Sequence, residues 1–446
     1  MVAAKTDILI VGAGAKAAGI ATKVHVLNEL GLGPISLKVV EGTERAASWL
    51  GLNGMTSGEE PLAVTPIKDI GFPYQSHREF GEAGEAIDAG TQAFSWQRYM
   101  IARRRYARWI DAGSPSVRHR DYGEYLTWVL SRATQGVEHV AGRVERVELE
   151  GGEGWSVEVA EPGGSSRHAC GALVLTGPGV HRAFPHEPEV AARLFHCDSR
   201  RDEFARLPDD GCDLAIAGGG ESALSCVMFL RGLKPNCRFT IYTPMLPLSR
   251  GESFLENRVF SDPDEVEWEQ LDLQTRRDFV KHSDRGVFDP PSLSAIAYDD
   301  RVRFVTGRVV DVGRGEGDGV RVEYESPAGP VSAAHDYAVN CTGFDLLAQL
   351  RQLFPATTQA EIEERVGPLW EATRGTEVPI GRFLELEGMR PWLQIPGLAG
   401  LSQGPGFANL GALGLLSNRV LQPLVTELAS GLDADGRMQY KTLSLE

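Results

Sequence analysis

Two glycine-rich turns have the residue types and spacing that bind a dinucleotide. The first lies in Asp7–Gly19, after an apolar run at Ile8–Val11 that predicts a buried parallel strand. Gly12, Gly14 and Ala17 form the pattern G-x-G-x-x-A where this strand turns into a helix. The first glycine permits a tight turn, the second lets the backbone approach a pyrophosphate, and the small third residue lets helix pack on strand. The helix N-terminus then points at the phosphates.

An acidic residue follows the first turn at the expected place. A strand is predicted at Leu37–Val40, and Glu41 sits at its end, where a carboxylate can accept hydrogen bonds from both ribose hydroxyls. The turn also begins a few residues from the N-terminus, the usual place for an FAD-binding βαβ unit. An ordinary βα turn in another α/β protein is the alternative, because glycine-rich turns are common. The strand, the helix and the acid together favour dinucleotide binding.

The same pattern returns in the middle of the chain. Asp213–Ala217 is another apolar strand, and Gly218, Gly220 and Ala223 follow it as a second G-x-G-x-x-A. A helix over Glu221–Leu230 is expected to begin at this turn. The second turn therefore predicts a second nucleotide-binding module, with Gly218 and Gly220 against the phosphates.

Each turn is followed by the same order of elements. After the first turn the predicted strands are Val144–Leu149, Ser156–Val159 and Ala172–Leu175, which ends at Thr176-Gly177. After the second turn come a strand at Arg238–Tyr242, a predicted meander of Val302–Val305, Arg308–Val312 and Val320–Tyr324, and a strand at Tyr337–Asn340 that leads to Thr342-Gly343. We therefore predict an α/β protein with two Rossmann-like domains, one for FAD and one for a nicotinamide nucleotide.

The repeat suggests a division of the chain into three segments. Residues 1–195 are expected to form the first part of the FAD-binding domain. Residues 196–334 are expected to form the NADPH-binding domain, with a substrate-contacting insert around 250–295. Residues 335–446 are expected to return to the FAD domain through a glycine-rich stretch at 404–414 and to close the substrate site. A smaller substrate-binding region then lies between and around the two domains.

Composition excludes several classes of partner. The chain has 446 residues, enough for two or three domains, and 42% of them are hydrophobic, as in soluble globular proteins. A formal net charge of -16 argues against nucleic acid and against anionic membrane surfaces. No stretch approaches the length of a membrane span.

The cysteines exclude one flavoenzyme class. The six are scattered, with no C-x-x-C, so buried free thiols and a cytoplasmic location are expected. A disulfide reductase needs a redox cysteine pair, and the sequence offers none. The linker Gly177–Arg200 also lacks the F-x-G-x-x-x-H-x-x-x-W pattern of Baeyer–Villiger monooxygenases.

A series of short stretches, in one order along most of the chain, resembles a particular family. The stretches are Trp49 with Gly54-Met55, Leu62 with Pro66–Asp69, Asp121-Tyr122 with Tyr125-Leu126 and Trp128, Gly218–Ala223, Asn257 with Val259-Phe260 and Pro263, Asp336 with Cys341–Phe344, and Leu416–Asn418. They are similar to motifs of the microbial N-hydroxylating flavin monooxygenases, which hydroxylate the side-chain amine of lysine or ornithine for siderophores. No single stretch is specific, but the series is.

The resemblance implies roles for individual residues. Lys68 would pair with the substrate α-carboxylate, Asn257 would bind the amino-acid end of the substrate, and Ser417 would lie where substrate and flavin meet. Alternatives remain for each: Lys68 as a loop surface lysine, Asn257 as the cap of a helix starting near Pro263, and Ser417 as the N-cap of the last helix. The cofactor contacts that the resemblance adds to the two turns are Trp49, Met55, Ser222, Arg250, Thr342, Gly343 and Leu416.

The sequence departs from the family pattern at four places. Ala63–Thr65 lacks a glutamine that often precedes the lysine, and Asp284–Phe288 lacks a second substrate asparagine. Glu221 replaces the commoner glutamine, and Thr243 stands where an arginine is usual, which leaves Arg250 to pair with a 2′-phosphate. These departures resemble the actinobacterial lysine branch, which supplies mycobactin-type siderophores.

The reaction that the resemblance implies needs no protein nucleophile. NADPH would reduce FAD, O₂ would add as a C4a-hydroperoxide, and the amine of L-lysine would take the distal oxygen to give N6-hydroxylysine. The protein would exclude water and favour the neutral amine, which in free lysine titrates near about 10.4. The family also tends to form homo-oligomers.

Three alternatives to this function stay open at this point. The first is an L-ornithine N5-monooxygenase, which keeps the mechanism and changes the substrate. The second is an uncoupled flavin NADPH oxidase with another amine substrate. The third, from a different class, is a nucleotide-binding regulatory or scaffold protein with vestigial catalysis, which the two intact glycine turns disfavour.

Overall fold

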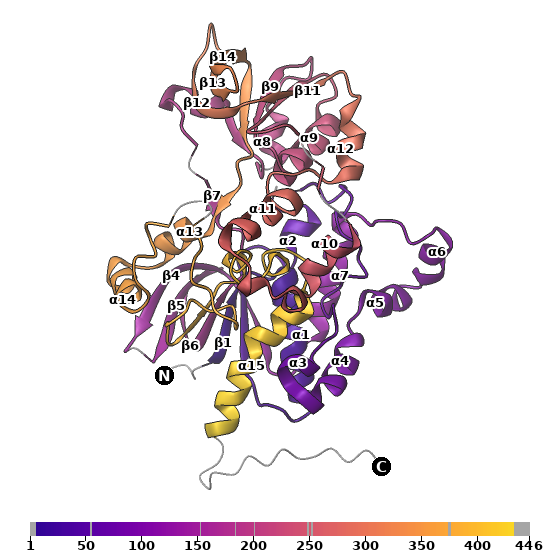
Figure 1. Ribbon diagram of the computed structural model, residues 1–446, viewed down its shortest axis with the longest axis vertical. Helices are drawn as coiled ribbons and strands as arrows, with labels where there is room; N and C mark the ends of the chain where they lie inside the picture. Colours follow the sequence, from indigo (N-terminus) through magenta and orange to yellow (C-terminus); the bar gives the residue numbers. More distant parts are fainter. Residues whose placement is uncertain are drawn as a thin grey trace.

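The fold comes from a computed structural model (Figure 1), which describes residues 6–53, 56–151, 153–182, 184–199, 201–247, 249–250, 253–372 and 376–431. Two sheets, one at each end of the elongated molecule, form the cores of two modules (Figure 1). The predicted α/β architecture with two Rossmann-like units is confirmed.

The first module is built on a seven-stranded sheet in the order β3-β2-β1-β6-β5-β4, with β17 also paired to β6. Its strands are β1 (Thr6–Val11), β2 (Leu37–Glu41), β3 (Val137–Ala141), β4 (Arg143–Glu150), β5 (Gly154–Glu161), β6 (Gly164–Leu175) and β17 (Trp392–Gln394). β1 pairs in parallel with β2 and β6, whereas β5 pairs antiparallel with both β4 and β6. Ile8, Leu9 and Ile10 are 0% exposed, as a strand covered on both faces requires.

Helices cover the first sheet. α1 (Ala15–Glu29) follows the first glycine turn and packs against α15 (Leu413–Gly431), which returns from the far end of the chain. The remaining helices of this module, with η denoting 3₁₀ helices, are α2 (Ala47–Leu50), α3 (His77–Phe80), η1 (Gly81–Ala83), α4 (Gly84–Gln92), α5 (Trp96–Ala102), α6 (Tyr106–Asp111), α7 (His119–Arg132), α13 (Leu346–Leu353), α14 (Ala356–Val366), η5 (Pro396–Leu398) and η6 (Pro405–Phe407).

The second module contains a five-stranded parallel sheet in the order β11-β10-β9-β15-β8. The strands are β8 (Leu194–His196), β9 (Asp213–Ala217), β10 (Arg238–Thr243), β11 (Val302–Thr306) and β15 (Tyr337–Asn340). The helices of this part are η2 (Pro188–Arg193), α8 (Arg201–Ala205), α9 (Glu221–Leu233) and α12 (Pro290–Ala297). β8 and β15 pair in this sheet, so the chain enters and leaves it near residues 194 and 340.

The predicted meander of the second module is partly wrong. Val302–Val305 lies in β11, which pairs in parallel with β10, so that Val302 faces Phe239. The meander consists instead of β12 (Arg308–Arg314), β13 (Val320–Ser326) and β14 (Gly329–His335). Gly307 alone separates β11 from β12, so spacing along the chain could not show that the two strands belong to different sheets. β14 escaped the prediction because most of its side chains are exposed and carry little hydrophobic signal.

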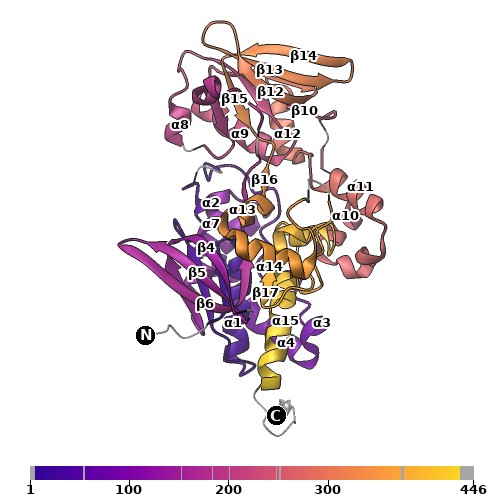
Figure 2. The ribbon, with the colours of Figure 1, turned by 90° about the vertical axis from the view of Figure 1, so that its left-hand side faces the viewer.

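Two features of the connections position the site. β7 (Val180–His181) pairs antiparallel with β16 (Phe344–Asp345), and this short ribbon lies at the waist between the modules (Figures 1 and 2). The insert between β10 and β11 contains α10 (Phe254–Ser261), η3 (Pro263–Val266), η4 (Trp268–Gln270) and α11 (Leu273–Ser283). Although the insert belongs by sequence to the second module, Figures 1 and 2 place α10 beside the returning part of the first.

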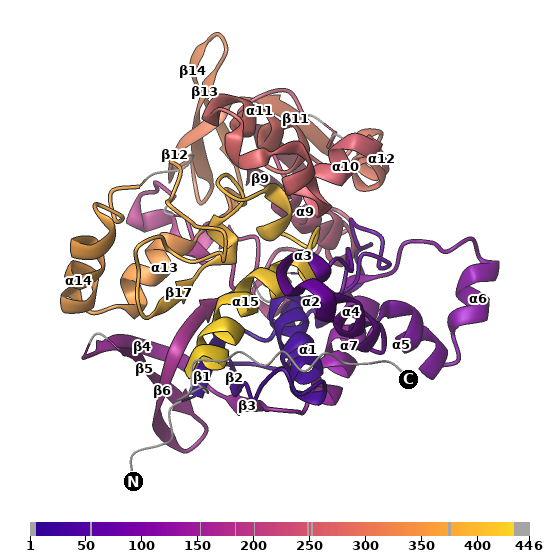
Figure 3. The ribbon, with the colours of Figure 1, turned by 60° about the horizontal axis from the view of Figure 1, so that its bottom comes forward.

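The segment with α5 and α6 projects from the first module, with α6 at its tip (Figures 1 and 3). Within this segment Trp96, the first residue of α5, packs edge to face on Trp109 of α6, with ring centroids 6.2 Å apart. In the described ranges, none of the helices combines the length and apolar character needed to cross a bilayer.

Candidate active site

A cleft of about 2030 Å³ runs between the two modules. Its wall includes Gly12 and Gly14 from the first glycine turn and Ser222 from the second. Lys68, on the segment between α2 and α3, and Asn257, on α10, line the same cleft. The fold thus brings both predicted nucleotide turns and two of the predicted substrate residues to one cavity.

The first glycine turn is shaped to receive a pyrophosphate. Gly12 has a φ of 97°, and a Cβ placed there would lie 2.7 Å from Thr176 Oγ1, so this position needs glycine. Gly14 caps α1, and a Cβ on it would meet no atom within 4 Å, which leaves open space at the helix N-terminus. Ala17 is 0% exposed, as the packing of helix on strand requires. These residues fit the diphosphate of FAD.

Glu41 stands beside this turn in a defined orientation. Its Oε2 accepts a hydrogen bond from the backbone nitrogen of Ala13 at 2.9 Å, and its Oε1 accepts one from Thr43 at 3.0 Å. Glu41 also lines the cleft, so its carboxylate is held where a ribose bound next to the pyrophosphate would reach it.

The second turn repeats the geometry of the first. Gly218 has a φ of 148°, and a Cβ there would lie 2.3 Å from the carbonyl oxygen of Cys341. Gly220 caps α9, and Ser222, one residue into that helix's first turn, faces the cleft. Across the turn, Thr342 donates its hydroxyl to Asn340 Oδ1 at 2.7 Å. These residues fit a second dinucleotide, with Thr342 and Gly343 also on the cleft wall.

The remaining predicted cofactor residues lie in different surroundings. Trp49 lines the cleft and packs edge to face on His119 and Tyr122, with centroid distances of 5.2 and 5.3 Å. Leu416 is 0% exposed in α15 and belongs to the core. Met55 lies outside the described residues.

Arg250 and Glu221 face each other at the second turn. Arg250 Nη2 donates to the carbonyl oxygen of Ala63 at 2.8 Å, and its Nη1 lies 3.8 Å from Glu221 Oε1. Burial raises the pKa of Glu221 to about 7, although the Arg250 guanidinium opposes the shift. Arg250 therefore joins the second turn to the Lys68 loop, and its pairing with a 2′-phosphate stays a prediction.

Lys68 and Asn257 meet on the wall of the cleft. Lys68 Nζ donates to Asn257 Oδ1 at 3.4 Å, although 189 residues separate the two. Lys68 is half-buried on the cleft wall, and its role at the substrate, against the alternative of a loop surface lysine, stays a prediction. Asn257 lies inside α10 and donates its Nδ2 to Ser253 O, while Asp262 caps the helix that starts at Pro263. The capping alternative for Asn257 is wrong.

Ser417 is not among the residues that the structure places on the cleft wall. It is 0% exposed, and its Oγ donates to the carbonyl oxygen of Gly414 at 2.8 Å. Because α15 begins at Leu413, Ser417 lies within the helix and is not its N-cap. The backbone that precedes α15 lines the cleft instead, at Ala408–Gly411. A substrate role for Ser417 stays a prediction.

Sequence reasoning missed Lys16, a cation in the cleft. It occupies an unspecified position of the first G-x-G-x-x-A pattern, so the motif gave no signal for it. Its Nζ donates to the carbonyl oxygen of Ala408 at 3.0 Å. Burial, aided by the nearby Arg285, lowers the pKa of Lys16 to about 8, while Asp284 opposes this. Lys16 thus places a titratable positive charge between the first turn and the returning segment.

Comparison with known proteins identifies the family. A family profile described as L-lysine 6-monooxygenase/L-ornithine 5-monooxygenase matches residues 87–303. The L-lysine N6-monooxygenase MbtG of Mycobacterium sp. (strain MCS) is 35% identical over 426 residues, which cover 93% of this chain and 94% of the relative. The chain belongs to the lysine/ornithine monooxygenase family. MbtG of Mycobacterium tuberculosis (strain ATCC 25618 / H37Rv) is 34% identical over 421 residues, with 93% and 94% coverage.

Solved structures support the same assignment. Lysine monooxygenase NbtG from Nocardia farcinica aligns with a TM-score of 0.79 at 35% identity, covering 93% of this chain and 99% of that one. The ornithine N-hydroxylase KtzI of Kutzneria sp. 744 aligns with a TM-score of 0.74 at 18% identity, covering 95% and 99%, and shows the shared fold. The prediction of a flavin-dependent N-hydroxylating monooxygenase is confirmed by this family membership, and a purely regulatory or scaffold role is disfavoured.

Proposed function

We propose that this member of the lysine/ornithine monooxygenase family hydroxylates L-lysine to N6-hydroxylysine for siderophore biosynthesis, with FAD, NADPH and O₂. The observation that carries the proposal is the single cleft in which the Lys68–Asn257 pair faces the two glycine turns. The substrate is supported by relatives named for lysine that are 34 to 35% identical over 93% of the chain. The ornithine enzyme at 18% identity supports the fold alone.

The residues of the cleft suggest how the chain supports this reaction. Bound FAD, reduced by NADPH, supplies the activated oxygen that is transferred to the amine. The ammonium group of Lys68 pairs with the α-carboxylate of the substrate, and the Asn257 amide binds the same amino-acid end. The cleft wall excludes water from the side-chain amine, which favours its neutral, nucleophilic form. Fixing one end of the substrate orients the other, so the chain contributes by position and desolvation.

Other assignments remain part of the proposal. Ser417 and Leu416 are buried in α15 and act on the cleft through the backbone that precedes this helix. The residues that serve the cofactors are Trp49, Met55, Ser222, Arg250, Thr342 and Gly343. The three-segment division at 195 and 334 is proposed with its insert around 250–295. A homo-oligomer and a cytoplasmic location are proposed as well, the latter supported by six free cysteines.

The deciding experiment measures hydroxylated amine and NADPH oxidation in parallel. FAD-loaded protein is assayed with L-lysine and with L-ornithine as separate substrates. N6-Hydroxylysine with little product from ornithine is the expected result. Product from ornithine alone would show that the substrate is L-ornithine. NADPH consumption that yields only H₂O₂ with either amine would show that the protein is an NADPH oxidase.

The pKa of Glu221 predicts a pH-dependent affinity for NADPH. With a pKa of about 7, this carboxyl is mostly neutral at pH 6 and mostly ionised at pH 8, when it repels the phosphates at the second turn. In a solvated site, two unit charges about 4 Å apart interact by about 1 kcal/mol, so the ionised carboxylate would weaken NADPH binding roughly fivefold. We expect the NADPH KM of wild type, divided by that of Glu221→Gln, to rise about fivefold from pH 6 to pH 8.

The glutamine variant is the control, because titration of the nucleotide's own phosphates affects both proteins alike. Steady-state rates with L-lysine at saturation give the KM values. A ratio that stays constant across this pH range would show that Glu221 does not sense the phosphates.

A further inference from the structure

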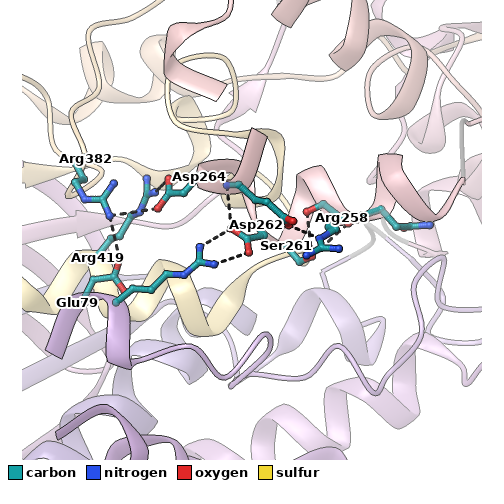
Figure 4. Close-up of polar contacts among 10 residues, drawn as sticks. Glu79, Arg258, Ser261, Asp262, Asp264, Arg382 and Arg419 are labelled. Carbon is teal, nitrogen blue, oxygen red and sulfur yellow. Dashed lines mark hydrogen bonds and ion pairs between the residues drawn. The ribbon is translucent and has the colours of Figure 1, made fainter. Parts of the chain in front are cut away.

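A network of ion pairs fastens the insert to the first module (Figure 4). It joins two aspartates that flank Pro263 to four charged side chains of the first module. We call this network the insert clamp; its members are Arg78, Glu79, Asp262, Asp264, Arg382 and Arg419. Asp262 follows directly on α10, five residues after Asn257.

The first half of the insert clamp is a bidentate ion pair between Arg78 and Asp262. Arg78, on α3, donates from Nη1 and Nη2 to the two carboxylate oxygens of Asp262, at 2.5 and 2.7 Å. The Asp262 side chain is 7% exposed, and the Arg78 side chain is 28% exposed. The hydrogen bonds to Asp262 raise the pKa of Arg78, so the guanidinium stays charged. Such a bidentate arginine–carboxylate pair specifies geometry as well as energy.

The second half of the insert clamp is centred on Asp264. Its Oδ1 accepts from Arg419 Nη2 at 2.5 Å, and its Oδ2 accepts from Arg382 Nη2 at 3.3 Å. Arg419, on α15, is 0% exposed, and Arg382 also reaches Glu79 Oε1 at 3.4 Å. Burial alone would raise the pKa of Asp264, but Arg419 and Arg382 together hold it below its ordinary value. A buried guanidinium without this carboxylate would be costly, so Arg419 requires the insert in place.

Close backbone contact completes the attachment. A Cβ on Gly406 would lie 1.8 Å from the carbonyl oxygen of Phe260, and one on Gly404 would lie 2.6 Å from Pro263 Cβ. The end of α10 therefore rests directly on the returning backbone of the first module. None of the side chains of α10 is buried, so an apolar face does not hold this helix in place. The end of α10 is held by this backbone contact and by the insert clamp. Further along the insert, Trp268 and Arg276 donate to the carbonyl oxygen of Leu401 at 2.9 and 2.8 Å.

We propose that the insert clamp is a positioning device for the substrate, which sets the distance from Asn257 to Lys68 by fixing α10 to the FAD-binding module. The inference rests on the proposed function. The Lys68–Asn257 contact is already 3.4 Å long, so a small displacement of α10 breaks it. Misplacement by about 1 Å can cost roughly 100-fold in an enzyme reaction. The clamp thereby keeps the substrate end of the cleft with the FAD module, although α10 belongs by sequence to the NADPH module.

Asp262→Asn tests this role, since the amide keeps the shape and the capping oxygen but removes the charge opposite Arg78. We expect the KM for L-lysine to rise about tenfold, while FAD content and NADPH-driven flavin reduction without lysine stay at wild-type values. Glu265→Gln is the matched control, because Glu265 pairs with Arg258 inside the insert and does not reach the first module. This control is expected to keep the wild-type KM.

A double variant separates positioning from general stability. If Asp262 acts through Asn257, Asp262→Asn adds nothing to the KM of Asn257→Ala, whereas independent effects would multiply. Arg78→Gln, which breaks the same pair from the other module, should behave like Asp262→Asn. Unchanged KM values in both single variants, multiplying effects in the double variant, or loss of FAD and folding in both single variants would each overturn the proposal. Failure of wild type to hydroxylate L-lysine would instead contradict the proposed function, and direct L-lysine binding by calorimetry would still test the clamp.

Discussion

Replacing Lys68 with methionine is expected to lower kcat/KM for L-lysine by about 100-fold. Lys68 is half-buried on the cleft wall, and its ammonium donates to Asn257 Oδ1 at 3.4 Å. In the proposed function these two groups together bind the amino-acid end of the substrate. Removing one partner of a partly buried charge pair costs about 3 kcal/mol, which corresponds to the stated loss. Methionine keeps an unbranched stem as far as Cε and removes only the ammonium, which lies 5.6 Å from the centroid of the Phe72 ring.

The assay for this variant compares the rate of hydroxylamine formation with NADPH-driven flavin reduction in the absence of substrate. The reduction rate should stay unchanged, because the proposal assigns Lys68 to the substrate and not to the nucleotides. Lys68→Arg is expected to recover part of the lost kcat/KM, since arginine keeps the positive charge but carries it on a planar guanidinium group. A wild-type kcat/KM in the methionine variant would show that Lys68 does not bind the substrate.

Replacing Gly14 with alanine is expected to weaken FAD binding by roughly 30-fold with little loss of stability in the apoprotein. Gly14 has a φ of -89°, which any residue adopts, and its added Cβ meets no protein atom within 4 Å. The methyl group would instead occupy the space in which the pyrophosphate must approach the backbone. Such overpacking costs about 2 kcal/mol, whereas the exchange at the helix N-cap costs about 1 kcal/mol or less.

Gly12→Ala is the matched comparison in the same turn. There the φ of 97° and the 2.7 Å approach to Thr176 Oγ1 strain the folded chain itself. We expect this variant to lose about 1 to 3 kcal/mol of stability as well as FAD. Flavin absorbance after gel filtration, fluorescence titration with FAD and thermal unfolding of the apoproteins distinguish the two variants. Wild-type FAD affinity in Gly14→Ala would show that the pyrophosphate does not bind at this turn.

The charged groups of the cleft and of the insert clamp were harder to predict from the sequence than the glycine turns. Lys16 stands in a variable position of a motif whose glycines carry the signal, and its lowered pKa arises from burial against Ala408, far along the chain. Arg419 and Asp264 come from distant segments with no recognisable spacing. A sequence pattern reports local geometry, whereas these pairings depend on how distant segments pack.

Local sequence determined the two nucleotide-binding modules. Gly12, Gly14, Gly218 and Gly220 act within single turns, and the apolar runs before them are the buried strands β1 and β9, so short-range spacing was sufficient. The series of motifs along the chain also identified the family correctly. Lys68 and Asn257 were found through those motifs, because nothing in the spacing of two residues 189 positions apart predicts contact.

Tertiary structure alone decided three matters. It assigned Val302–Val305 to the parallel sheet, because strand partners are chosen by long-range pairing and not by the order of strands along the chain. It buried Ser417 in the core, because α15 packs on α1 with the face that carries Ser417 turned inward. It also placed α10 on the FAD module through the insert clamp, where charges from distant segments meet only after both modules have folded.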